Sequence, residues 1–156
     1  MPLISMFEEG NILYFTPFYF KNGKSAPAPK FFIVLKHVDS HSILASLPTK
    51  KDSIPSEHTI QDGCVELPEI NFNCFVISNK IEVTTCGKKF DLPTHIYGYQ
   101  IDTHEVTLMK EIYPLEGTDY IVWGKMKSAL FNELIRCIKK SKAVPKKYIR
   151  ILNSEF

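Results

Sequence analysis

Three short segments of the chain decide its fold: Gly10–Phe15 (GNILYF), Lys30–Leu35 (KFFIVL) and Ser42–Thr49 (SILASLPT). Each is rich in the aromatic and aliphatic residues that favour strands, and turn-forming residues lie between them. The stretch between the first two is rich in Lys, Ser and Pro and has no helical period. This pattern predicts neighbouring strands of an all-β core, with the polar groups at the strand ends gathered into a surface site.

The rest of the chain predicts further strands and one helix. Over Lys127–Lys140, apolar residues recur at i, i+1, i+4, i+5 and i+8, which forms one face of a helix. Ser128 is expected to cap the start of this helix, and Pro145 lies just beyond its end. Tyr148–Leu152 is expected to form a short strand or turn. Further strands are expected over Cys64–Leu67, Phe72–Ser78, Ile81–Thr85, His95–Ile101 and Val106–Tyr113.

These elements predict one domain over residues 1–156, mainly β, in the form of a small barrel with a packed C-terminal helix over 127–140. The composition, 44% hydrophobic and 23% charged, is ordinary for a soluble globular protein. The longest apolar run, Phe31–Leu35, is far shorter than the roughly 20 residues that a membrane-spanning helix needs. Since the first residues contain neither a basic leader nor a long apolar run, we expect no secretory signal and a cytoplasmic location.

Charge is distributed unevenly along the chain. Residues 1–124 carry a net charge of −5, whereas residues 125–156 carry a net charge of +7. Such a split indicates that the C-terminal end faces a polyanion. Two interpretations of the basic stretch Arg136–Arg150 remain open. It is either an RNA-facing patch with Tyr148 stacking on a base, or the solvated face of an amphipathic helix.

The four cysteines, Cys64, Cys74, Cys86 and Cys137, show no C-x-x-C spacing typical of a zinc or thioredoxin-like site. The simplest interpretation is that they are free thiols, buried or half-buried, in a reducing compartment. A Cys64–Cys74 bridge across a hairpin is the alternative, and it requires oxidising surroundings.

The order of these elements resembles the MazF/PemK-like toxins of type II toxin–antitoxin systems. Gly10–Leu13 resembles the glycine and first strand of that family, and Lys30–Leu35 resembles its basic residue followed by an apolar second strand. Ala45–Thr49 resembles its third strand, which ends in Thr or Ser, and Tyr99–Asp102 resembles a later strand with an Ile-Asp pair. The helix expected over Lys127–Lys140 resembles the one that closes the family fold.

The resemblance implies an SH3-like barrel that forms a homodimer and cleaves single-stranded RNA through its 2′-hydroxyl without a metal or cofactor. The implied catalytic residues are Lys30, which supplies positive charge at the start of strand two, and Thr49, whose hydroxyl binds a phosphate oxygen. Ser46 is a less favoured hydroxyl, because it lies before the strand end. The residues implied to attract the RNA are Lys24, Lys50, Lys51 and Tyr148.

A general base or an orienting group is also needed, and the candidates are His58, His95 and Asp102. The five histidines show no metal-binding spacing on a helix, so we expect no metal. The resemblance further implies control by a small antitoxin protein that blocks the groove of Lys30 and Thr49.

One departure from the family motivates an alternative function. Members of the family carry Arg followed by Pro at the start of the second strand, whereas this chain carries Pro29 before Lys30. Lysine lacks the bidentate fork with which arginine holds a phosphate. The alternative is therefore a non-catalytic SH3-like barrel that binds nucleic acid or a protein.

Overall fold

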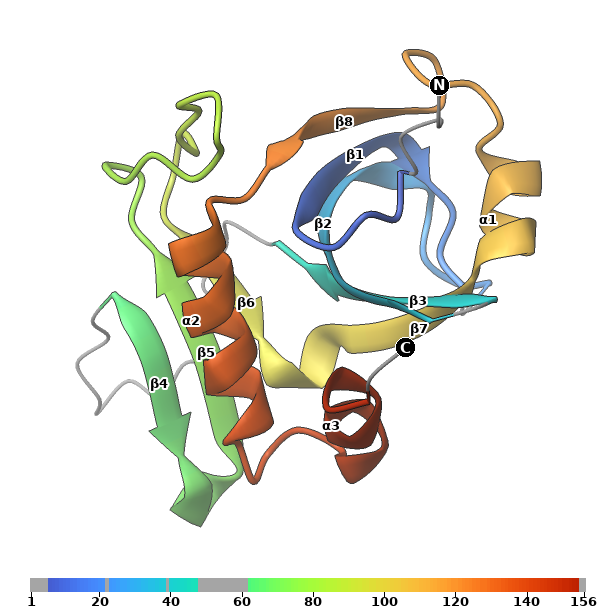
Figure 1. The fold of residues 1–156 in the computed structure, drawn as a ribbon. Helices are drawn as coiled ribbons and strands as arrows, with labels where there is room; N and C mark the ends of the chain where they lie inside the picture. Colours follow the sequence, from blue (N-terminus) through green and yellow to red (C-terminus); the bar gives the residue numbers. More distant parts are fainter. Residues whose placement is uncertain (1–5, 22, 39, 48–61, 155–156) are drawn as a thin grey trace.

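A computed structural model of the protein describes residues 6–21, 23–38, 40–47 and 62–154 (Figure 1). Strands dominate, and three α-helices and two short 3-10 helices join them. In chain order the elements are β1 (Asn11–Phe18), β2 (Ala28–Val38), β3 (His41–Ser46), β4 (Gly63–Leu67), η1 (Pro68–Ile70), β5 (Phe72–Ile77), β6 (Thr94–Tyr97), η2 (Gly98–Gln100), β7 (Ile101–Glu105), α1 (Val106–Ile112), β8 (Tyr120–Lys125), α2 (Ser128–Lys139) and α3 (Lys146–Leu152).

Five antiparallel strands form the larger sheet, in the order β7-β3-β2-β1-β8. In Figure 1 this sheet curls, with β8 above, β3 and β7 below, and α1 on its open side. We call the face toward α1 the inner face. It is covered by a largely aromatic core, in which α1 and the N-terminal residue Phe7 take part. The inner-face residues of this core include Leu13, Phe15, Phe32, Val34 and Leu44.

The opposite, outer face of this sheet packs against the second part of the molecule. That part is the antiparallel sheet β4-β5-β6, with α2 packed on β4 and β5 and α3 near β2. Alternation along β2 accounts for both cores, because Ile33 and Leu35 face outward while Phe32 and Val34 face inward. A strand buried on both faces is typically an unbroken apolar run, as Phe31–Leu35 (FFIVL) is.

The expectation of a mainly β fold is confirmed, but that of a single helix is wrong. Residues 106–112 form α1 instead of a strand, because Val106, Met109 and Tyr113 recur at helical spacing and pack into the inner core. The terminal segment forms α3. Helix α2 matches the expectation, although its N-cap is Lys127 and no side chain caps it.

Two other expectations about strands are corrected. Residues 95–101, expected as one strand, are divided among β6, the 3-10 helix η2 and the first residue of β7. Residues 81–85 contribute only an isolated bridge between Thr84 and Met126, because the Thr84 hydroxyl accepts a hydrogen bond from Lys88 N at 2.9 Å and folds the chain into a loop. Strand β8, which the sequence pattern did not predict, supplies the fifth strand. Among the described residues its partner is β1 and that of β7 is β3, so the curled sheet is not closed into a barrel.

Candidate functional site

Lys30 is the third residue of β2 and lies on the inner face of the curled sheet. Its cross-strand partner is Phe15, which in turn pairs with Tyr120 of β8, so an aromatic row leads up to the lysine. The side chain is half-buried, and this desolvation lowers the pKa of its ammonium group. A lysine in such a setting attracts an anion more strongly than an exposed one and releases its proton more readily.

Ser46, the last residue of β3, lies beside this lysine. Ser46 pairs with Phe32, and Lys30 precedes Phe32 by two residues, so Ser46 and Lys30 are diagonal neighbours on one face. Ser46 is buried, and its Oγ has no hydrogen-bond partner among the described residues. A buried hydroxyl without a partner is uncommon in folded proteins, and this one keeps both a donor and an acceptor unused. We call Lys30, Ser46 and Phe32 the Lys30 mouth.

Asp102 lies on the edge strand β7 and forms an ion pair with a lysine side chain. Its Oδ2 is 3.1 Å from Lys21 Nζ, and its Oδ1 accepts a hydrogen bond from Thr103 N at 2.8 Å. Two residues further, His104 is buried with its ring edge-on to Phe18 and Phe32. Burial, with a smaller effect from Lys21, lowers the pKa of His104 to about 4, so its imidazole is neutral at pH 7.

The other residues expected at the site fall into different places. Lys24 is exposed in the loop between β1 and β2. His95 is buried on β6 of the second sheet, where its ring stacks on Tyr97 at a centroid distance of 6.2 Å, so it is not brought to the Lys30 mouth. The expected residues that lie outside the described part of the chain are Thr49, Lys50, Lys51 and His58.

Tyr148 does not offer a ring for base stacking. It lies in α3 with its side chain 7% exposed within the outer core, and Lys147 Nζ lies 5.0 Å from its ring centroid. Its hydroxyl donates a long hydrogen bond of 3.5 Å to Asp102 Oδ1. The structure therefore brings two of the expected residues, Tyr148 and Asp102, together in a structural contact.

A groove of about 300 Å³ lies on the outer face, lined by Phe31, Phe90, Trp123 and Lys89 among others. Phe90 stacks on Trp123, and the ring of Phe31 meets that of Trp123 edge-on at a centroid distance of 5.8 Å. Lys88 Nζ lies 5.1 Å from the Trp123 ring centroid. Aromatic faces beside cations are the usual lining of sites that bind single-stranded nucleic acid. We call this site the aromatic groove.

The cysteines differ from both expectations, because Cys64 of β4 and Cys137 of α2 form a disulfide. Cys64 pairs with Phe75 in the register of β4 and β5, so Cys74 points to the opposite face of the sheet and cannot reach it. Cys74 is a buried free thiol whose pKa is raised to about 12 by desolvation. Cys86 is exposed and free, and a hydrogen bond with Thr84 lowers its pKa.

These features are hard to predict from the sequence alone. The aromatic groove joins β2, β8 and the loop before β6, and the single Trp of the chain was its one conspicuous residue. The disulfide joins residues 73 positions apart, which no local spacing reveals. Ser46 was visible as a hydroxyl near a strand end, but its burial depends on the tertiary fold.

Within the described segments, no group of three or more His, Cys, Asp or Glu side chains is arranged to hold a metal ion. The described helices include none with the length and apolar character to cross a membrane. No protein-family model matches the sequence, and a search of curated proteins gives no match either.

Proposed function

We propose that this protein is a metal-independent endoribonuclease of the MazF/PemK type that cleaves single-stranded RNA at the Lys30 mouth. The observation that carries the proposal is the setting of Lys30, which is half-buried beside an aromatic row, has a lowered pKa and adjoins the buried hydroxyl of Ser46. A desolvated cation next to an unpartnered hydroxyl suits a phosphate that gains negative charge during a reaction.

The chemistry needs three tasks from the protein. A base removes the proton of the RNA 2′-hydroxyl, whose oxygen then attacks the adjacent phosphorus. The resulting phosphorane carries extra negative charge, which the Lys30 ammonium group stabilises. Lys30 then donates its proton to the departing 5′-oxygen, a step that its lowered pKa favours. The products are a 2′,3′-cyclic phosphate and a 5′-hydroxyl.

The remaining roles follow from the resemblance in sequence. We assign the second phosphate-binding hydroxyl to Thr49, attraction of the RNA to Lys24, Lys50 and Lys51, and the base to His58 or Asp102. The strand order β7-β3-β2-β1-β8 and its curl support an open version of the SH3-like barrel. We further propose that the active form is a homodimer, and that an antitoxin inhibits it by covering the Lys30 mouth.

A cleavage assay in EDTA tests the proposal. The full chain and the Lys30→Ala/Thr49→Ala variant are incubated with a long RNA of mixed sequence. Lys80→Ala serves as the control, because Lys80 is an exposed lysine in the turn after β5 and has no assigned role in binding RNA. We expect discrete fragments ending in 2′,3′-cyclic phosphate with the wild type and with Lys80→Ala, and a rate at least 100-fold lower with the double variant. Intact RNA in every lane would refute the nuclease.

The aromatic groove favours a second candidate function, a non-catalytic module that binds single-stranded nucleic acid. In this case the bases stack on the rings beside Lys88 and Lys89, and no bond is cut. Binding would then weaken steeply with salt while the RNA stays intact. The same samples distinguish the two functions, since a salt-dependent gel shift without fragments supports only the module.

A further inference from the structure

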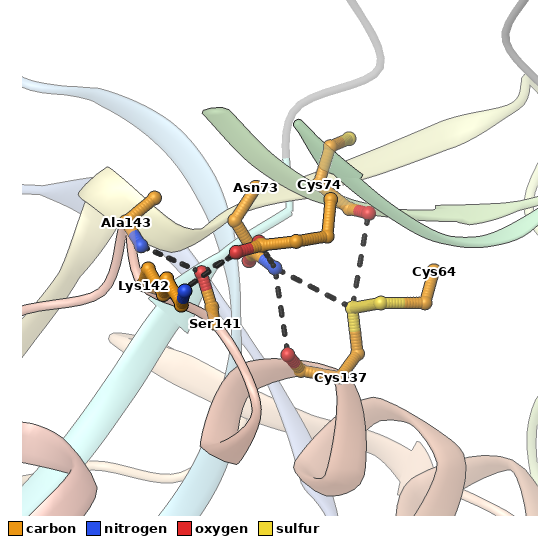
Figure 2. The surroundings of a disulfide bond; sticks show 8 residues. Cys64, Asn73, Cys74, Cys137, Ser141, Lys142 and Ala143 are labelled. Carbon is orange, nitrogen blue, oxygen red and sulfur yellow. Dashed lines mark hydrogen bonds between the residues drawn. A yellow bond between two sulfur atoms is a disulfide. The ribbon is translucent and has the colours of Figure 1, made fainter. Parts of the chain in front are cut away.

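The Cys64–Cys137 disulfide is open to solvent on one side only. Cys64 belongs to the edge strand β4 and is exposed, whereas Cys137 lies in α2 and is 4% exposed (Figure 2). Thiol–disulfide exchange begins when a thiolate attacks one of the two sulfur atoms, and the accessible one is attacked first. The geometry therefore assigns attack to Cys64 Sγ and makes Cys137 the leaving thiol.

A small cavity lies against this disulfide. It has a volume of about 220 Å³ and is lined by both cysteines together with Phe75, Glu133, Arg136 and Lys140. Arg136 and Lys140 lie one turn apart on α2 and its C-cap, so two of the three charged groups around the cavity are cations. A thiol that carries carboxylates is attracted into such a cavity, while a cationic thiol is repelled.

The leaving sulfur has a hydrogen-bond donor in place. Asn73 Nδ2 lies 3.6 Å from Cys137 Sγ and 3.4 Å from Cys137 O. Dashed lines in Figure 2 mark both contacts. A donor to the sulfur stabilises a thiolate, and a more stable thiolate leaves faster.

We propose that the Cys64–Cys137 disulfide is an exchange site for an anionic low-molecular-weight thiol of the glutathione class. The thiolate attacks Cys64 Sγ and forms a mixed disulfide, while the Cys64–Cys137 bond breaks. Its electron pair passes to Cys137 Sγ, which takes up a proton from water. A second thiolate attacks the small-molecule sulfur of the mixed disulfide, so that Cys64 is released as a thiolate and the two small thiols leave oxidised as their disulfide.

The surroundings allow this reduction of the disulfide to proceed without loss of the fold. On β4, Glu66 accepts hydrogen bonds from Ser141 Oγ at 2.7 Å, Lys142 N at 2.9 Å and Asn73 Nδ2 at 3.1 Å, so the strand stays anchored to the end of α2 after reduction. Cys74 faces the other side of the sheet, and its raised pKa keeps it a thiol, so it does not compete for either sulfur.

Peptide mapping and exchange rates test the proposal without RNA. All proteins carry Cys86→Ser, because Cys86 is an exposed thiol that would also react. Protein purified without reductant is first mapped for the Cys64–Cys137 bond. It is then treated with glutathione or with cysteamine, a cationic thiol, and quenched with acid at intervals for mass spectrometry. We expect the first adduct on Cys64, and faster attack per thiolate by glutathione than by cysteamine.

Variants that retain the disulfide distinguish the effect of the charges around the cavity from the general reactivity of the bond. Arg136→Gln/Lys140→Gln should lower the glutathione rate several-fold and leave the cysteamine rate unchanged or higher, whereas Lys139→Gln, outside the cavity, should change neither. In Cys137→Ser, oxidised glutathione should give a stable adduct on Cys64. Three results would each overturn the proposal. They are absence of the disulfide in the purified protein, a first adduct on Cys137, and exchange rates that do not depend on the charge of the thiol.

Discussion

The indole ring of Trp123 lies parallel to the ring of Phe90, with 5.2 Å between the centroids and 5° between the planes. The two residues come from β8 and from the loop before β6, so their stacking joins the curled sheet to the second sheet. Lys88 strengthens the arrangement, since its Nζ lies over the indole and also donates a hydrogen bond to Trp123 O at 2.5 Å. The pair forms a stacked platform in the wall of the aromatic groove.

This platform predicts a direct optical signal for RNA binding. Because Trp123 is the single Trp of the chain, a base that stacks on it should quench the intrinsic fluorescence of the protein. Trp123→Ala should reduce the affinity for a single-stranded RNA oligomer by about 1–3 kcal/mol, or roughly 5- to 150-fold, measured by fluorescence anisotropy of labelled RNA. Leu92→Ala is the matched control, because Leu92 lines the same groove without an aromatic face. An equal loss in both variants would contradict stacking.

Lys30 should lower the free energy of unfolding, although the proposed RNA cleavage needs it. Its pKa is lowered because the folded protein desolvates the ammonium group, so the charged form is disfavoured relative to the unfolded chain. Lys30→Met keeps the apolar stem and removes the charge. It should raise the free energy of unfolding by roughly 0.5 kcal/mol, since solvent screens the half-exposed ammonium group, and it should abolish RNA cleavage. Urea unfolding at pH 7 measures this gain.

The sign of the pH dependence provides the control. A lysine whose folded pKa is lowered reduces the free energy of unfolding, and this reduction is complete below the folded pKa. It disappears as the pH rises to the pKa of the unfolded chain, near 10.5. The difference between wild type and Lys30→Met should therefore shrink from pH 7 to pH 10. Lys80→Met, at an exposed position in the turn after β5, should leave stability unchanged. A gain for Lys80→Met as large as that for Lys30→Met would argue against desolvation as the cause.

His104 predicts a loss of stability in acid. Its folded pKa of about 4 lies below the ordinary value of 6.5, so between these values the unfolded chain binds the extra proton. The stability is complete above pH 6.5 and decreases by about 3 kcal/mol as the pH falls toward 4. His104→Phe fits beside Phe18 and Phe32 and cannot be protonated, so it should flatten the profile in this window. Urea titrations from pH 4 to pH 7.5 measure both proteins, and parallel profiles would contradict the assignment.

Much of the fold is predictable where the sequence pattern depends on a single strand or helix. The run Lys30–Leu35 identified a strand buried on both faces, and the amphipathic period identified α2 within one residue at each end. The segment 106–112 fits a strand by sequence alone because it is short and largely apolar. Only its packing in the inner core makes the helical spacing decisive. Short apolar runs are ambiguous by periodicity.

The candidate site was predictable only in part, for a similar reason. Lys30 was identified from its place at the start of a strand, but its desolvation depends on the neighbouring strands β1 and β8. Tyr148 looked like an exposed aromatic among basic residues, yet α3 turns its ring into the outer core. The Cys64–Cys137 bond depends on which face of β5 packs against α2. The register between β4 and β5 determines this face, and the sequence alone does not reveal that register.

The close approach of Gly124 to Thr84 gives a last prediction about how the molecule is held together. A Cβ atom on Gly124 would lie 2.6 Å from Thr84 Cγ2 and 3.0 Å from Thr84 Cβ, and Thr84 is fully buried. Gly124→Ala should therefore destabilise the protein by about 1–3 kcal/mol through overpacking, measured by thermal or urea unfolding.

A double-variant cycle identifies the atom responsible. Thr84→Ser removes the Cγ2 methyl group and keeps the hydroxyl that accepts the hydrogen bond from Lys88 N. If the clash with that methyl group causes the loss, Gly124→Ala should cost markedly less in the Thr84→Ser background, with a coupling energy of about 0.5–3 kcal/mol. Additive losses would instead place the cost in the β8 backbone. The result bears on the aromatic groove, because Gly124 follows Trp123 on β8 and the Thr84 loop leads to Lys88.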